Sequence, residues 1–287
     1  MARIFRLWRN LNSLVEVGVI CLLTIIFLGT VIPNIIPTSP TEQNYSMMYE
    51  HPNPSMLFGG DKFGRDVFVR VLVGIRYSLS VGLISSLSAG VIGTFIGIIS
   101  AYYGKLLDLL VQRLVDAIMS IPIFMLGLLV VVAMGTGFFN LLLAITIALT
   151  PRFARLARGQ TLEVLDYDYI EAAEALGAKD RDTITKHILP NIIGPIIVQV
   201  ALFTGTAIII ESGISFLGLG IQPPTPSFGT MIKQGLSVLS LAPWVTLGPA
   251  SFLVLTVLSV NILGDGLRNQ FDPKASKKKA MAQTTER

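Results

Sequence analysis

Long, uninterrupted runs of apolar residues dominate the pattern along this chain. A helix that crosses the hydrocarbon core of a bilayer needs about 20 mainly apolar residues. Six runs approach or exceed that length, over residues 15–36, 77–103, 107–134, 139–157, 191–217 and 244–265. They are too long and too continuous for the strands of a membrane barrel, which are short and alternate. The pattern therefore predicts an all-α membrane protein with six transmembrane helices.

The composition agrees with this prediction. Of the 287 residues, 52% are hydrophobic and only 14% are charged, whereas a soluble domain carries roughly 25% charged residues. The net charge is +4, which by itself would be compatible with a nucleic-acid ligand. The basic residues lie beside the apolar runs, however, where they fix orientation in a membrane. We therefore expect the lipid bilayer, and no nucleic acid, as a partner.

Lysine and arginine are unevenly distributed between the two sides of the predicted helices. A cytoplasmic N-terminus places 17 of the 22 basic residues in the cytoplasm and five outside, as the positive-inside rule requires. Both termini are then cytoplasmic in a multi-pass protein of the plasma membrane. The expected cytoplasmic segments are 1–14, 158–190 and 267–287, and the expected extracytoplasmic segments are 37–76 and 218–243. No A-x-A-like cleavage site follows the first run, so it is expected to be an uncleaved anchor.

Small residues recur about every four positions along the second run. Small side chains allow helix backbones to approach closely within lipid. This spacing predicts that the helix over 77–103 lies inside the bundle, with a stripe made of Ser78, Gly82, Ser86, Gly90, Gly93 and Gly97.

Motifs for catalysis are absent from the sequence. It contains no phosphate-binding G-x-x-x-x-G-K-[ST] loop, no H-E-x-x-H and no cysteine cluster. Its two histidines, His51 and His187, fall in predicted loops on opposite sides of the membrane. We therefore expect no catalytic residue, no metal site and no cofactor, which disfavours an intramembrane enzyme. Any energy from ATP would have to come from another subunit.

Two carboxylates within the predicted helices stand out, because a charged side chain at the bilayer centre is costly. Asp116 follows Arg113 by three residues, so the two are expected to pair on one helix face. Glu211 has no base nearby in sequence and precedes "SGISFLG". It is expected to bond exposed backbone at a helix break. Both residues are candidates for a structural or gating role.

The most polar internal stretch is the predicted cytoplasmic loop. Helical periodicity over 162–176 places an apolar stripe opposite a face that carries Glu163, Glu171 and Glu174. Gly177 suits the left-handed residue that ends such a helix. A helix lying on lipid headgroups is one interpretation, but its polar face would normally be basic. The acidic face favours a protein partner.

This stretch, "EAAEALGAKDRDTITKHILP", resembles the EAA loop of ABC-importer permeases. The matching positions are Glu171, Ala172, Ala173, Gly177, Leu189 and Pro190. His187 stands where the general pattern has an aliphatic residue, although "HILPN" is typical of the dipeptide/oligopeptide/nickel branch. "LFGGDKFGRDVFVRVLVGIRYSL", "SFLGLGIQPPTPSFGTMI" and "NILGDGLRNQFDP" resemble further signatures of that branch. The resemblance extends from about residue 15 to Pro273.

The resemblance implies the type I ABC importer permease fold, with a core over 77–266, and the role of the second permease subunit. Its implied partners are a paralogous permease subunit, two cytoplasmic ATPases that bind the EAA loop, and an extracytoplasmic solute-binding protein. The implied solute is a dipeptide or oligopeptide, with nickel, a metallophore or an oligosaccharide as alternatives. A secondary transporter or channel is a more distant alternative, since it would usually carry more ionisable groups within its spans.

Overall fold

The computed structural model describes residues 13–271, and the regular secondary structure in that range is helical. Residues 1–12 and 272–287, which belong to the expected cytoplasmic N-terminus and tail, lie outside the described residues. The helices are α2 (Ser13–Thr30), α3 (Ile32–Ile35), η1 (Tyr45–Met47), α4 (Val67–Tyr103), α5 (Lys105–Met119), α6 (Ile123–Met134), α7 (Phe138–Leu165), α8 (Asp168–Ala175), α9 (Asp180–Asp182), η2 (Thr183–Ile188), α10 (Leu189–Leu217), α11 (Phe228–Leu236) and α12 (Trp244–Phe271).

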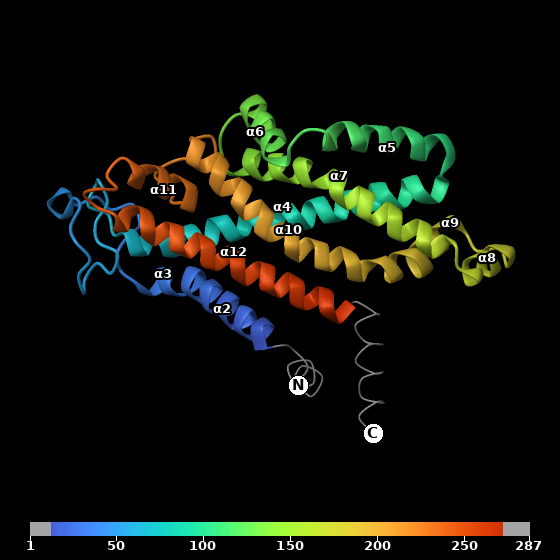
Figure 1. The fold of residues 1–287 in the computed structure, drawn as a ribbon, viewed down its shortest axis with the longest axis horizontal. Coiled ribbons are helices and arrows are strands. Elements are labelled where there is room, and N and C mark those ends of the chain that lie inside the picture. Colours follow the sequence, from blue (N-terminus) through green and yellow to red (C-terminus); the bar gives the residue numbers. More distant parts are fainter. Residues whose placement is uncertain (1–12, 272–287) are drawn as a thin grey trace, which may run out of the picture.

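The long helices α2, α4, α7, α10 and α12 run along one direction and form a bundle (Figure 1). One end of the bundle carries α3, α11 and the segment between α3 and α4, and the opposite end carries α8 and α9. Five helices within the described range are long and apolar enough to cross a membrane, and the bent pair α5 and α6 would make a sixth. The prediction of an all-α membrane protein is confirmed.

Helix α4 is the centre of the bundle, and it packs against both α7 and α10. It begins at Val67, ten residues before the predicted start, because the Asp66 carboxylate caps it by accepting from the N–H groups of Phe68 and Val69. The predicted stripe of small residues makes this packing possible. A Cβ added at Gly93 would lie 2.6 Å from the carbonyl oxygen of Thr150 in α7. The predicted interior position of this helix is confirmed.

The single span predicted over 107–134 is wrong in its geometry. The structure divides this stretch into α5 and α6, which meet at 90° around residues 120–122. Pro122 explains the break, because it has no N–H to donate and disfavours helical backbone in the residue before it. Asp108, Gln112 and Asp116 share one side of α5, so this helix is amphipathic rather than apolar all round.

The predicted helix over 162–176 is also divided in the structure. Helix α7 continues to Leu165, eight residues beyond the end predicted for its span, even though Pro151 lies within it. The chain turns at residues 166–167, and α8 begins at Asp168. On the other side of Gly177, α9, η2 and α10 follow one another without a break, so that 180–217 forms one long helical segment. The polar loop therefore contains the short helix α8, which lies between the end of α7 and the beginning of the segment 180–217.

Candidate functional site

The outer face of α8 is uncovered at one end of the bundle (Figure 1). Glu171 and Ala172 are exposed and Ala173 is half-buried, and the structure shows no hydrogen bond or ion pair of the Glu171 side chain within residues 13–271. Leu176, directly after the helix, is 90% exposed. This end of the bundle therefore presents one exposed apolar side chain and one exposed carboxylate close together in the sequence.

The opposite face of α8 is anchored to the bundle. Ile170 is only 2% exposed and belongs to the same buried apolar cluster as Ile188 and Ile192. The Asn191 side-chain amide donates to the hydroxyl of Tyr169 at 3.1 Å, and the Tyr169 and His187 rings lie 6.1 Å apart. These contacts join α8 to the beginning of α10.

The turn after α8 has the geometry expected from the sequence. Gly177 has a φ of +85°, so the predicted left-handed conformation is confirmed. No heavy atom lies within 4 Å of the position that a Cβ would occupy there. The turn leads to Asp180, whose carboxylate accepts from the hydroxyl of Tyr102 at the end of α4. Leu189 and Pro190, the last two matching positions, begin α10 directly after η2.

The predicted pairing of Asp116 with Arg113 is wrong. Asp116 pairs with Arg155 of α7, and Arg113 is exposed. A second pair, between Asp108 and Arg158, joins the same two helices with a closest distance of 2.6 Å. These contacts give the acidic side of α5 a structural role, since they fix that helix along α7.

Glu211 is fully buried, and its partners differ from those predicted. Its carboxylate accepts from three hydroxyl groups: Ser78 Oγ at 2.8 Å, Ser215 Oγ at 2.8 Å and Ser212 Oγ at 3.2 Å. Ser215 in turn accepts from the N–H of Ile221, at 3.2 Å, in the segment after α10. Hydroxyl groups rather than exposed backbone therefore satisfy the carboxylate, which joins α10 to α4 and to the segment before α11.

A second buried charge cluster, which the sequence reasoning did not identify, lies at the end of the bundle opposite α8. Asp61, Arg65 and Arg70 are each at most 3% exposed. Asp61 pairs with Arg65 at 2.6 Å and lies 3.7 Å from Arg70. Arg70 also donates to the carbonyl oxygen of Pro40. The cluster therefore holds the segment between α3 and α4 against the bundle.

Two further contacts attach this segment to the helices that follow it. Arg65 donates to the Gln234 side chain of α11 at 3.4 Å, and the Trp244 indole of α12 donates to the carbonyl oxygen of Gly60 at 3.4 Å. At the base of the segment, burial raises the pKa of the Asp66 carboxyl, and the N–H groups of Val69 and Phe68 oppose this rise. The alternating acids and bases of "GGDKFGRD" were the available signal for this cluster.

A family profile described as "Binding-protein-dependent transport system inner membrane component" matches residues 93–277. The chain belongs to this family. The permease fits the family's description as an inner-membrane component. Within residues 13–271, no group of three or more His, Cys, Asp or Glu side chains could hold a metal ion.

Individual relatives and a solved structure agree with the family. The permease is 39% identical to the dipeptide transport system permease protein of Alkalihalophilus pseudofirmus over 263 residues, which are 92% of this chain and 86% of that protein. It is 40% identical to the glutathione transport system permease protein of Pectobacterium atrosepticum over 231 residues, covering 80% and 77%. Its fold matches the inward-facing MetNI methionine ABC transporter with a TM-score of 0.58 and 21% identity, covering 69% of this chain and 95% of that one. The expected ABC importer permease fold is confirmed.

Substitutions at Glu211 should separate its hydrogen bonding from its charge. Glu211→Ala removes the acceptor of two hydroxyl groups at 2.8 Å, and each buried group left unsatisfied costs about 1–3 kcal/mol. We therefore expect a lower unfolding temperature in detergent for this variant. Glu211→Gln keeps one acceptor oxygen and the side-chain shape, so its stability and transport should stay near those of the unsubstituted permease. Lost transport in the Gln variant at normal membrane abundance would instead assign the role to the negative charge.

Proposed function

We propose that the permease forms half of a solute pathway with a paralogous permease subunit, and that α8 binds one of two separate cytoplasmic ATPases that hydrolyse ATP. The observation that carries this proposal is the two-sided character of α8. Glu171 is exposed and has no hydrogen bond or ion pair among the described residues, and Leu176, directly after the helix, is 90% exposed, while Ile170 is buried in the apolar cluster of the bundle. A helix held on one face and uncovered on the other is suited to receive a partner's movement and pass it on.

The proposed path of that movement follows contacts within the chain. Ile170 belongs to the same buried cluster as Ile188 and Ile192, which lie in the helical segment 180–217. Glu211, near the other end of this segment, accepts a hydrogen bond from Ser78 of α4. Closure of the ATPases would displace α8, tilt this segment and change how α4 and α10 meet at the far end. The permease would thus alternate between access from the cytoplasm and access from outside.

The proposed orientation places α8 in the cytoplasm together with both termini. The segment between α3 and α4, and the segment around α11, then face outward, where an extracytoplasmic binding protein would deliver solute. The division of basic residues, 17 inside and five outside, supports this orientation. Cysteines placed at Ser55 and Ser276 in a Cys21→Ser background should then react with an impermeant reagent from opposite sides of the membrane. Equal labelling from outside would reject this topology.

The proposed solute is a dipeptide or oligopeptide. Two relatives are named for dipeptide and glutathione transport, and glutathione is itself a small peptide. The decisive experiment reconstitutes the permease in liposomes with its paralogue, both ATPases and the binding protein. Import of a labelled dipeptide should require ATP and the binding protein, and should be inhibited by unlabelled peptide but not by Ni²⁺ or an oligosaccharide. Import driven by an ion gradient without ATP would overturn the proposal in favour of a secondary transporter.

A further inference from the structure

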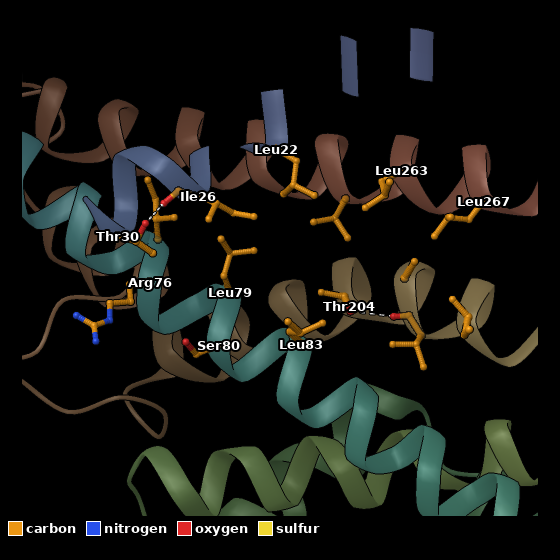
Figure 2. Close-up of a pocket in the computed structure, with 15 residues that line it drawn as sticks. Leu22, Ile26, Thr30, Arg76, Leu79, Ser80, Leu83, Thr204, Leu263 and Leu267 are labelled. Carbon is orange, nitrogen blue, oxygen red and sulfur yellow. Dashed lines mark hydrogen bonds between the residues drawn. The ribbon is translucent and has the colours of Figure 1, made fainter. Parts of the chain in front are cut away.

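A groove of about 430 Å³ opens between α2, α4, α10 and α12 (Figure 2). Its walls are almost entirely hydrocarbon, formed by side chains that include Leu22, Ile26, Leu79, Leu83, Ala201 and Leu263. Two hydroxyl groups in the wall are already satisfied: Thr30 donates to the Ile26 carbonyl oxygen at 2.7 Å, and Thr204 donates to that of Val200 at 2.8 Å. The wall therefore offers an apolar surface and no free hydroxyl donor at these two positions.

Arg76 is the charged residue of this lining. It lies at the end of the groove near Thr30, away from Leu267, and Figure 2 shows its guanidinium directed away from the apolar side chains. The side chain is exposed, and the structure gives it no hydrogen bond or ion pair with another residue between 13 and 271. The buried arginines Arg65 and Arg70 nearby in sequence, in contrast, both have partners. An apolar channel with an unpaired cation at one end matches an amphiphile with an acyl chain and an anionic head.

The size of the groove distinguishes such an amphiphile from a protein helix. A helix is about 10–12 Å across, so it would lie over the open side of the groove rather than inside it. An acyl chain is narrow enough to lie along the lining side chains, so it is the occupant that the shape of the groove favours. The helices around the groove are membrane-spanning in length and composition, so phospholipid is the amphiphile that surrounds them.

We propose that this groove binds an anionic phospholipid, with an acyl chain between α2 and α10 and the phosphate bound by Arg76. The guanidinium supplies several donors in a plane, which suits a phosphate group. The bound lipid would fill the gap that separates α2 from α10. The assignment of this lipid to the outer leaflet rests on the proposed orientation, but the binding itself does not.

Native mass spectrometry of the assembled transporter tests the proposal, with nanodiscs made of equal parts phosphatidylethanolamine and phosphatidylglycerol as the source of lipid. Arg76→Gln should weaken retention of phosphatidylglycerol by about tenfold, the equivalent of 1.4 kcal/mol. Arg76→Lys should retain most of it, because the charge remains. Arg113→Gln is the matched control, since Arg113 is an exposed arginine of α5 outside the groove. An equal loss in the Arg76→Gln and Arg113→Gln variants would overturn the proposal as a nonspecific effect of charge.

A second variant tests the groove independently of Arg76. Ala201→Phe places a ring among the lining residues, so retention of both phospholipids should fall. Unchanged retention of phosphatidylglycerol in this variant would overturn the acyl-chain site. Efficient cross-linking from a cysteine at Leu79 to the paralogous subunit would also overturn it, by identifying a protein occupant. Peptide import in liposomes, measured in parallel, keeps a failure of the lipid site distinct from a failure of the proposed transport function.

Discussion

Leu176→Asp should abolish ATP-coupled import while leaving the permease folded and inserted. The side chain is 90% exposed, so its replacement removes almost no contact within the chain. Exposed positions of this kind usually change stability by at most about 0.5 kcal/mol. In the proposed complex, however, the leucine would be buried against an ATPase, and a carboxylate there would be desolvated without a partner. Loss of an interface hot spot costs at least about 2 kcal/mol, or roughly thirtyfold in affinity.

Co-purification of the ATPases with the permease, followed by peptide-stimulated ATP hydrolysis in liposomes, measures this effect. Glu171→Lys, at a second exposed position of the same segment, should produce the same loss by reversing the charge. The matched control is Leu57→Asp, which makes the same chemical change at a leucine that is 56% exposed at the opposite end of the molecule. That control should retain the ATPases. Normal coupling in both the Leu176→Asp and the Glu171→Lys variants would refute the docking surface and favour a helix that rests on lipid headgroups.

Asp61→Asn should destabilise the permease more than any other single charge change considered above. Asp61 accepts from Arg65 at 2.6 Å and faces Arg70 at 3.7 Å, and all three residues are buried. Asparagine keeps the shape, but it leaves two buried guanidinium groups without a counter-charge. Removing one partner from a buried ion pair typically costs about 3–5 kcal/mol. The segment between α3 and α4 should therefore detach at lower temperature.

Trp244 provides the measurement, because its indole donates to the carbonyl oxygen of Gly60 in the same segment. Its fluorescence during thermal unfolding, recorded in a Trp8→Phe background, should show an earlier transition for Asp61→Asn. Asp182→Asn is the control, since Asp182 pairs with Lys186 at 2.7 Å but both side chains are well exposed. An exposed pair contributes about 0–1 kcal/mol. Equal shifts for the two variants would mean that the buried cluster does not stabilise the segment.

The sequence predicted the parts of this fold that depend on many residues at once. Apolar runs predicted the existence of the long helices, and spacing of small residues predicted the buried face of α4. The helix breaks were missed because each depends on a few residues. Pro122 alone breaks the helix, whereas the hydropathy averaged over 107–134 remains apolar. The turn at residues 166–167 likewise interrupts a stripe whose periodicity continues on both sides.

The partners of the charged residues within the helices could not be predicted from the sequence, for a different reason. Asp116 has a base three residues away in Arg113, yet it pairs with Arg155, 39 residues along the chain. Glu211 bonds Ser78, which is 133 positions distant. Such pairings follow from how helices pack, and local spacing carries no information about them. The motif identified the EAA positions in the sequence. The exposure of Leu176 and the burial of Ile170 could be seen only in the structure.

One turn, η2, sets the angular relation between the two ends of the long segment 180–217. It is a π-helical turn, in which the N–H of Leu189 bonds to the carbonyl oxygen of Ile184, five residues back. Such a turn accommodates one residue more than an α-helix would, and each residue of an α-helix advances the side-chain direction by about 100°. A helix shorter by one residue would therefore rotate Asp180, and with it the turn that carries α8, by about a quarter of a revolution relative to Glu211. A single extra residue thus sets the direction in which α8 projects from the bundle relative to the Glu211 carboxylate and its serine partners.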